Sequence, residues 1–138
     1  MEAACEILPG DRPGTFLLRM SGMDQSLVDL DDPTALAFPY VRRIGDVLDA
    51  AAPTGQPLRV VHVGGAGMTL PRYVAATRPR SAQVVLEPDT AVTALLRAEL
   101  PLPPRSGIKV RPVAGREGVA ALRDRYADVA VVDAFADA

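Results

Sequence analysis

The chain has 138 residues, enough for one hydrophobic core, and 49% hydrophobic with 23% charged residues is the composition of an ordinary globular protein. Its formal net charge of −2 argues against a nucleic-acid partner, and no apolar run approaches the roughly 20 residues of a membrane span. One cysteine, Cys5, excludes an internal disulfide and a cysteine-clustered metal site; with no signal-peptide pattern at the N-terminus, this favours a cytoplasmic protein.

The first third of the chain predicts a small β-sheet region followed by one helix. Turn residues such as proline, glycine and aspartate separate short apolar runs at 7–8, 15–19 and 25–30. From about residue 39 to residue 51, apolar side chains recur on one helical face. We therefore take residues 1–52 as an N-terminal β-hairpin region plus helix, and the loop 52–57 as the boundary after it.

From Leu58 onward, apolar strands alternate strictly with helices. The expected strands are 58–63, 82–87, 107–113 and 128–133, and the expected helices are 70–77, 90–99 and 116–124. Continuous apolar strands of this kind predict a parallel sheet covered on both faces. The fold class is therefore α/β, with a Rossmann-like doubly wound sheet of strand order 3-2-1-4 over residues 58–138. Thr69 is expected to cap the first of these helices.

The last strand, 128–133, would lie at an edge of the sheet although it is as apolar as a central strand. Such an edge invites pairing with another strand. We therefore expect that the chain is a fragment truncated after its fourth strand, or that something else covers this edge, and that the protein forms a homo-oligomer.

A glycine-rich turn follows the first parallel strand, with Gly64, Gly65 and Gly67. Glycines there let the backbone approach a ligand, although a tight turn without a ligand is the alternative. The dinucleotide pattern G-x-G-x-x-G is not met, because Leu70 occupies its third position, where a bulky side chain disfavours the NAD type of packing. The turn therefore favours a looser class that binds adenosylmethionine-like molecules, and an NAD-binding domain stays an alternative.

Two acids end strands of the predicted sheet. Glu87 lies 23 residues after Gly64, near the ~20 expected for an acid that accepts both ribose hydroxyls. Its alternatives are a solvated strand end and an anion at the next helix N-terminus. Asp133 ends the fourth strand at the same carboxyl edge, where it could act as a general base, bind an amine or cap the next element. Asp137, four residues later, has the same alternatives.

The other conspicuous side chains are expected to be structural. His62, the only histidine, lies within an apolar strand and is predicted to be a core residue with satisfied hydrogen bonds. Packing positions are expected for Tyr40, Tyr73 and Tyr126. Solvated faces are expected for Arg42, Arg43, Arg78 and Arg80.

Several segments resemble spermidine synthase and its relatives, in which an N-terminal β-hairpin region precedes a class I methyltransferase-like Rossmann domain. The turn MSGMDQS at 20–26 is similar to the family's LDG-x-x-Q segment, with Gly22 and Gln25 matching. VGGAGMTLPR at 63–72 resembles its GGGDGG-x-x-RE loop. VVLEPD at 84–89 and ADVAVVDAF at 127–135 resemble the strands that end in the ribose-binding acid and in the catalytic aspartate. The resemblance covers most of residues 15–135.

The resemblance implies a cofactor site without a metal. The cofactor would be S-adenosylmethionine, its decarboxylated form or the product methylthioadenosine. The residues implied to bind it are Gln25, Gly64, Gly65, Gly67 and Glu87. Asp133 is implied as the catalytic residue, which would orient or deprotonate an attacking amine.

Four departures from the family pattern concern activity. Ala66 stands where the family has the aspartate that holds the aminopropyl amine, and Ala136 replaces the second of two paired aspartates. Tyr40 lacks the accompanying glutamate that helps to grip the diamine, and the segment 113–116 lacks the acid that contacts adenine. Burying cationic amines without carboxylate partners is costly.

The sequence thus predicts a spermidine-synthase-like transferase domain with small-molecule partners and neither a nucleic-acid nor a membrane partner. If active, it would transfer an aminopropyl or a methyl group. The alternative from a different class is a catalytically degenerate relative that serves as a binding or assembly module.

Overall fold

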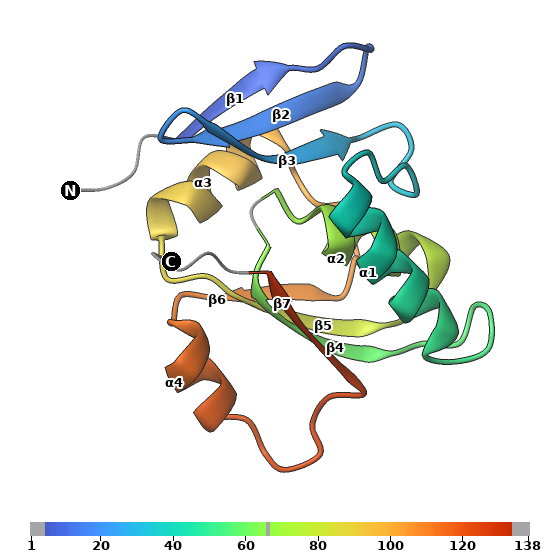
Figure 1. Cartoon of the computed structure of the whole chain (residues 1–138). Helices are drawn as coiled ribbons and strands as arrows, with labels where there is room; N and C mark the ends of the chain where they lie inside the picture. The colour runs from blue at the N-terminus through green and yellow to red at the C-terminus, as the bar shows by residue number, and fades with distance from the viewer. Residues whose placement is uncertain (1–4, 66, 134–138) are drawn as a thin grey trace.

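The computed structural model describes residues 5–65 and 67–133. Two sheets and four helices lie within these residues (Figure 1). Their bounds are β1 Cys5–Pro9, β2 Thr15–Met20, β3 Met23–Asp29, α1 Pro39–Ala50, β4 Arg59–Gly64, α2 Thr69–Thr77, β5 Ala82–Leu86, α3 Thr90–Glu99, β6 Ile108–Arg111, α4 Gly115–Ala120 and β7 Val129–Asp133. β1, β2 and β3 form an antiparallel sheet, and the other four strands form a second sheet.

The second sheet has the order β6-β5-β4-β7, and all its neighbouring strands are parallel. This confirms the predicted order 3-2-1-4, with the glycine-rich turn after the inner strand β4. Helices α1, α2 and α3 lie on one face of this sheet, together with the antiparallel sheet, and α4 lies on the other face (Figure 1).

Three clusters of buried apolar side chains hold these layers together. The first joins α1 and α2 to the parallel sheet and includes Leu48, Leu70, Val74, Val60 and Val131. The second joins the antiparallel sheet to α3 and includes Leu18, Val28, Met68, Leu96 and Leu100. The third lies on the α4 face and is formed by Val61, Val84 and Leu86, with Val113, Leu122 and Tyr126 packed against them. Each fully buried apolar side chain contributes about 1.5–3 kcal/mol.

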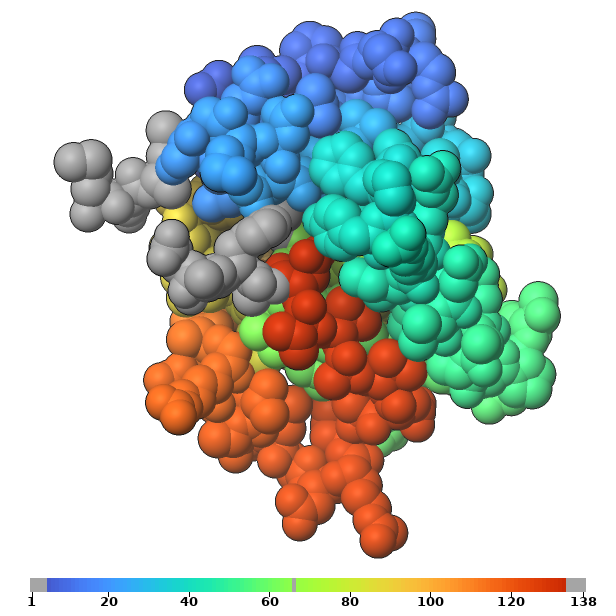
Figure 2. All heavy atoms as spheres, viewed as in Figure 1, coloured from blue at the N-terminus to red at the C-terminus, as the bar shows by residue number. Residues whose placement is uncertain are grey.

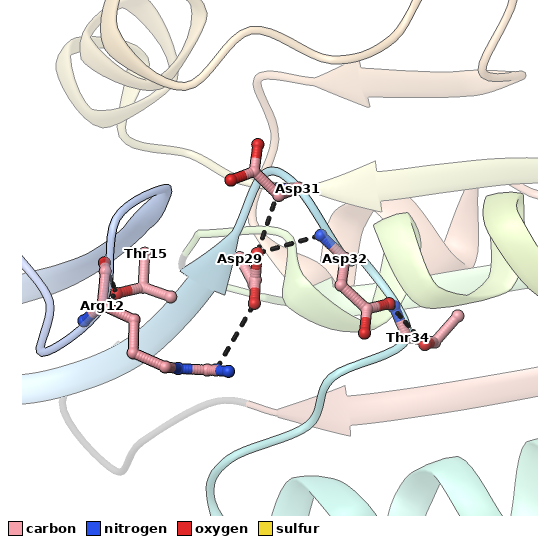
Figure 3. A network of polar contacts seen from close by, with 6 residues as sticks. All are labelled: Arg12, Thr15, Asp29, Asp31, Asp32 and Thr34. Atoms are coloured by element: carbon pink, nitrogen blue, oxygen red, sulfur yellow. Dashed lines mark hydrogen bonds and ion pairs between the residues drawn. The ribbon is translucent and has the colours of Figure 1, made fainter.

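A polar turn connects β3 to the segment before α1 (Figure 3). Asp29 Oδ1 accepts the backbone N–H groups of Asp31 and Asp32 at 3.0 and 2.9 Å, and its Oδ2 lies 3.5 Å from the Arg12 guanidinium. Asp32 in turn accepts the Thr34 N–H at 3.1 Å. Local side chain–backbone bonds of this kind hold a turn without regular structure.

Arg78 differs from its predicted place on a solvated face. Its side chain is only 3% exposed, whereas Arg42, Arg43 and Arg80 are exposed as predicted. The guanidinium donates to five backbone carbonyls at 2.8–3.1 Å, those of Leu48, Asp49, Ala52, Pro53 and Gln56. The last carbonyls of a helix lack the usual intrahelical hydrogen-bond donor. At the end of α1, the guanidinium of Arg78, which follows α2, donates to these carbonyls.

The cap of α2 also differs from the prediction. The N-cap residue is Met68 in a left-handed conformation (φ 64°), and no side chain caps the helix. Thr69, the predicted cap, begins the helix and donates its hydroxyl to the Leu27 carbonyl on β3 at 3.0 Å. A tertiary contact with β3 therefore replaces the local cap. Among the described residues, no helix combines the length and the apolar character of a membrane span.

Candidate functional site

The carboxyl ends of β4, β5 and β7 meet at one edge of the parallel sheet. Gly64 at the end of β4 lies in register with Asp133 at the end of β7. On the other side, Val63 lies in register with Leu86, the residue before Glu87. The predicted glycine turn, the predicted ribose acid and the predicted catalytic aspartate are thus brought to the edge where ligands bind in open α/β sheets.

The first part of the glycine turn needs glycine for its backbone conformation. Gly64 has φ 79° and Gly65 has φ 135°, values that residues with a side chain rarely adopt. Among the described residues, a Cβ atom on Gly65 would have only Val85 Cγ1, at 3.9 Å, within 4 Å. The turn closes through a hydrogen bond of 2.7 Å from the Met68 N–H to the Gly65 carbonyl. Ala66 lies outside the described residues.

Gly67 needs to be glycine for a different reason. A Cβ atom there would lie 2.6 Å from Val28 Cγ2 and 2.7 Å from Ser26 Oγ, both on β3. The Gly67 N–H donates to Ser26 Oγ at 3.0 Å. The close approach of the turn to β3 therefore explains this glycine, and its N–H is already engaged within the protein.

Gln25, implied to bind the cofactor, lies in a β-bulge. The register of β2 and β3 passes from Leu18↔Ser26 to Arg19↔Asp24, which leaves Gln25 as the extra residue. Bulges redirect side chains next to functional sites. Gln25 is half-buried, and its side chain makes no hydrogen bond to another described residue. It directly precedes Ser26, whose hydroxyl accepts the Gly67 N–H of the glycine turn.

Glu87 keeps one carboxylate oxygen without a protein partner among the described residues. Its Oε2 accepts the Asp89 N–H at 2.9 Å, and no contact is made by Oε1. The pKa of this half-buried carboxyl is raised, mainly because burial disfavours its charged form. The hydrogen bond from the Asp89 N–H lowers the pKa, whereas the charge of Asp89 raises it. The anion at the N-terminus of α3 is Asp89, whose Oδ1 accepts the N–H groups of Ala91 and Val92. One of the alternative roles considered for Glu87 therefore belongs to Asp89.

Asp133 is half-buried, and its side chain has no hydrogen bond or ion pair to another described residue. Burial raises the pKa of its carboxyl. Tyr40, near the start of α1, lies close to Asp133. Burial raises the pKa of the Tyr40 hydroxyl, and the negative charge of Asp133 raises it further. The structure thus brings Tyr40 to the site, although packing was predicted for it. Its match to the tyrosine on the family's first helix was the available signal. Asp137 and Ala136 lie outside the described residues.

Cys5 borders the site from the antiparallel sheet. Burial raises the pKa of its thiol, and so do the charges of Asp89, Glu6 and Glu87. β1 therefore lies close to Glu87 and to the start of α3. No sequence motif indicated this contact, because it depends on how the two sheets pack.

His62 is the predicted core histidine, 2% exposed and next to the glycine turn in sequence. Its Nε2 lies 2.7 Å from Gln83 Oε1, and Gln83 Nε2 donates to the Pro71 carbonyl at 2.9 Å. Burial lowers the pKa of the imidazole to about 4, although the bond to Gln83 acts in the opposite direction. A neutral, hydrogen-bonded histidine of this kind is structural.

Two hollows in the surface lie beside α1. A cleft of about 460 Å³ is lined by Thr34, Leu36, Pro39, Arg42, Arg43, Gly45, Asp46 and Tyr73. An apolar groove of about 210 Å³ separates α1 from β7. Within the described part of the chain, no group of three or more histidine, cysteine or acidic side chains is placed to hold a metal ion.

The comparisons with known proteins support the fold. No protein-family model matches this sequence, and no curated protein matches it significantly. The structure is similar to the crystal structure of a probable spermidine synthase from Corynebacterium glutamicum ATCC 13032, with a TM-score of 0.86 and 28% sequence identity. The match covers 99% of this chain and 50% of that chain, so this chain spans about half the length of the protein that it matches. The similarity confirms an α/β, methyltransferase-like fold.

Proposed function

We propose that this chain is a spermidine-synthase-like transferase domain that binds an adenosylmethionine-type cofactor, or its thioether product, at the carboxyl edge of β4, β5 and β7. One observation carries the proposal: Glu87, with a free carboxylate oxygen, and Asp133 flank the positive-φ turn at Gly64 and Gly65. Partly buried carboxylates without a cationic partner favour a ligand that brings hydroxyl donors and positive charge. A ribose and a sulfonium supply both.

The residues present fit such a ligand. Glu87 Oε1 would accept ribose hydroxyls, and the backbone at Gly65 leaves room for close approach. Gln25, redirected by its bulge, would complete the site from the antiparallel sheet. When bound, an adenosyl-sulfonium cofactor supplies an electrophilic carbon for aminopropyl or methyl transfer.

Asp133 would position the acceptor. A carboxyl whose pKa is raised by burial is a better proton acceptor than a solvated one, which suits a residue that holds and deprotonates an amine. The charge of Asp133 contributes to the raised pKa of the Tyr40 hydroxyl, which would offer a polar group at the same end of the site. A single carboxylate matches an acceptor with one cationic amine better than it matches a diamine.

Titration calorimetry with four ligands tests the proposal. We expect saturable binding of adenosylmethionine, of its decarboxylated form or of methylthioadenosine, and no binding of NAD. Binding of NAD alone would instead support the dinucleotide-binding alternative. If none of the four ligands binds, the cofactor site is refuted.

A degenerate relative that acts as a binding or assembly module is the second candidate. The loss of family acids at Ala66 and Ala136 favours it. Cofactor binding without any transfer to a panel of primary amines would distinguish this candidate from an active transferase.

A further inference from the structure

The α4 side of the molecule carries a concentration of positive charge. Five cationic side chains are exposed there, and we call them the basic face: Lys109, Arg111, Arg116, Arg123 and Arg125. Residues 109–125 also hold two acids, Glu117 and Asp124, so this stretch carries a formal charge of +3, five minus two. The whole chain carries −2, so the remainder carries −5.

β6 directs its two cations to the face that α4 covers. Its other two residues pack into the cluster with α3, and alternate side chains of a strand point to opposite faces. The register partners of Lys109 and Arg111 on β5 are Val84 and Leu86, which belong to the cluster on the α4 side. Lys109 and Arg111 therefore lie on the α4 side of the sheet, on its edge strand β6.

The remaining cations come from α4 and the segment after it. Arg116 lies on α4, which packs on Leu86 through Gly118. Arg123 and Arg125 shortly precede Tyr126, whose side chain packs against the same cluster. Figure 2 shows these segments, in orange, as the lower part of the molecule, away from the antiparallel sheet.

None of the five cations forms a side-chain hydrogen bond or an ion pair with another residue in the described part of the chain. Arginine binds carboxylates and phosphates bidentately, so four unpaired guanidinium groups are suited to an anionic partner. Tyr126 is not open for stacking, because the guanidinium carbons of Arg59 and Arg123 lie 6.0 and 5.8 Å from its ring centre.

We propose that the basic face is a docking surface for an acidic segment of another protein. Charge complementarity carries the proposal, and two features favour a polypeptide over a nucleic acid. Glu117 and Asp124 interrupt the cations, which suits the flexible, unevenly placed carboxylates of a peptide better than the regular charges of a phosphate chain. The aromatic ring on this face has the guanidinium groups of Arg59 and Arg123 beside it, whereas single-stranded nucleic acids are bound by open aromatic rings.

Fluorescence anisotropy with a labelled polyglutamate peptide of about 20 residues tests this surface. We expect binding that weakens between about 50 and 200 mM salt. The double variant Lys109→Glu, Arg111→Glu should lower the affinity by at least about fivefold, as expected for charge reversal at an interface. The matched control is Arg42→Glu, Arg43→Glu, which reverses two exposed charges on α1, on the opposite face of the sheet, and should change the affinity less than about twofold.

Three outcomes would overturn the proposal: no binding to the wild type at low salt, equal losses in both double variants, and tighter binding of a single-stranded oligonucleotide that the β6 variant abolishes. Circular dichroism verifies that each variant folds. If the β6 variant does not fold, Arg123→Glu, Arg125→Glu tests the same face from outside the sheet.

Discussion

Glu87 is the residue through which the cofactor proposal is most directly tested. Glu87→Ala removes the free carboxylate oxygen at the end of β5 and should weaken any adenosyl ligand by ~1–3 kcal/mol, the usual effect of losing a charged hydrogen-bond partner. Titration calorimetry measures this loss. Glu99→Ala, which removes an exposed glutamate at the end of α3, is the matched control and should leave the affinity unchanged. An unchanged affinity in Glu87→Ala would remove this residue from the site.

His62 should make the stability of the protein depend on pH. Its folded pKa of about 4 lies below the unfolded value of 6.5, so the unfolded chain binds the proton more readily. The associated stability is fully present above pH 6.5 and is lost as the pH falls toward 4. Since one pKa unit corresponds to about 1.4 kcal/mol, the loss amounts to about 3 kcal/mol.

Urea unfolding of the wild type and of His62→Gln, at pH 7 and at pH 4, measures this effect. The glutamine can still donate to Gln83 but does not titrate. Glu87 and Asp133 have raised pKa values and act in the opposite direction, but they are present in both proteins, so the difference isolates His62. An equal loss of stability in both proteins would contradict a buried neutral histidine.

At the residue scale, the sequence predicted where candidate site residues lie in the fold better than it predicted their contacts. The positions of Gly64, Glu87 and Asp133 at strand ends follow from the alternation of strands and helices. The surroundings of Arg78 and Thr69 do not, because both side chains bond to backbone carbonyls of distant elements. Residue type alone does not reveal such tertiary partners.

At the scale of elements, Arg78 links the end of α2 to the end of α1 through hydrogen bonds to backbone carbonyls. Arg78→Met keeps much of the apolar stem but removes the guanidinium from five carbonyls, of which, within the described residues, only those of Leu48 and Pro53 also accept a backbone N–H. We expect a loss of unfolding free energy of about 3 kcal/mol or more, equivalent to one or two charged hydrogen bonds. Denaturant unfolding should show almost no change for Arg80→Met, an exposed position two residues away. Similar losses in both variants would show that the carbonyl contacts of Arg78 contribute little.

The order and direction of the parallel strands could be predicted from sequence because short apolar runs separated by helices have few ways to pack. Element ends were less predictable. The helix expected over 116–124 ends at Ala120, and the strand expected over 107–113 is Ile108–Arg111. The contact of β3 with the glycine turn was also not predictable, because it depends on Gly67, whose pattern in the sequence indicated only a ligand turn.

At the scale of the whole molecule, the charged groups of the site limit its activity. We predict no efficient spermidine synthesis, because Ala66, Ala136 and the missing glutamate beside Tyr40 remove the carboxylates that the resemblance implies for binding cationic amines. The test is incubation with decarboxylated adenosylmethionine and putrescine, followed by chromatography for spermidine. Turnover near the enzyme median of ~10 per second would refute this prediction.

The two edges of the parallel sheet differ in how they are protected. β6 carries Lys109 and Arg111, and charged side chains hinder pairing at an edge. β7 carries no charge between its ends, and no strand in the described ranges pairs with its outer edge. Val132 on β7 is 71% exposed and Val47 on α1 is 64% exposed, and both line the groove. Val132 lies in register with Val63, which packs on the α4 side, so its side chain and α1 are on opposite faces of the sheet. Exposed apolar side chains on both faces beside a free strand edge are typical of an interface.

We therefore predict that this chain self-associates through β7 and α1. Light scattering at increasing protein concentration should show a dimer or a larger species. Val132→Lys should shift the protein toward the monomer, because a lysine would have to be desolvated in the interface. Val119→Lys, at an exposed apolar position on α4, is the matched control and should leave the association unchanged. A wild type that stays monomeric at high concentration, or an equal effect of both lysines, would show that the β7 edge does not mediate self-association.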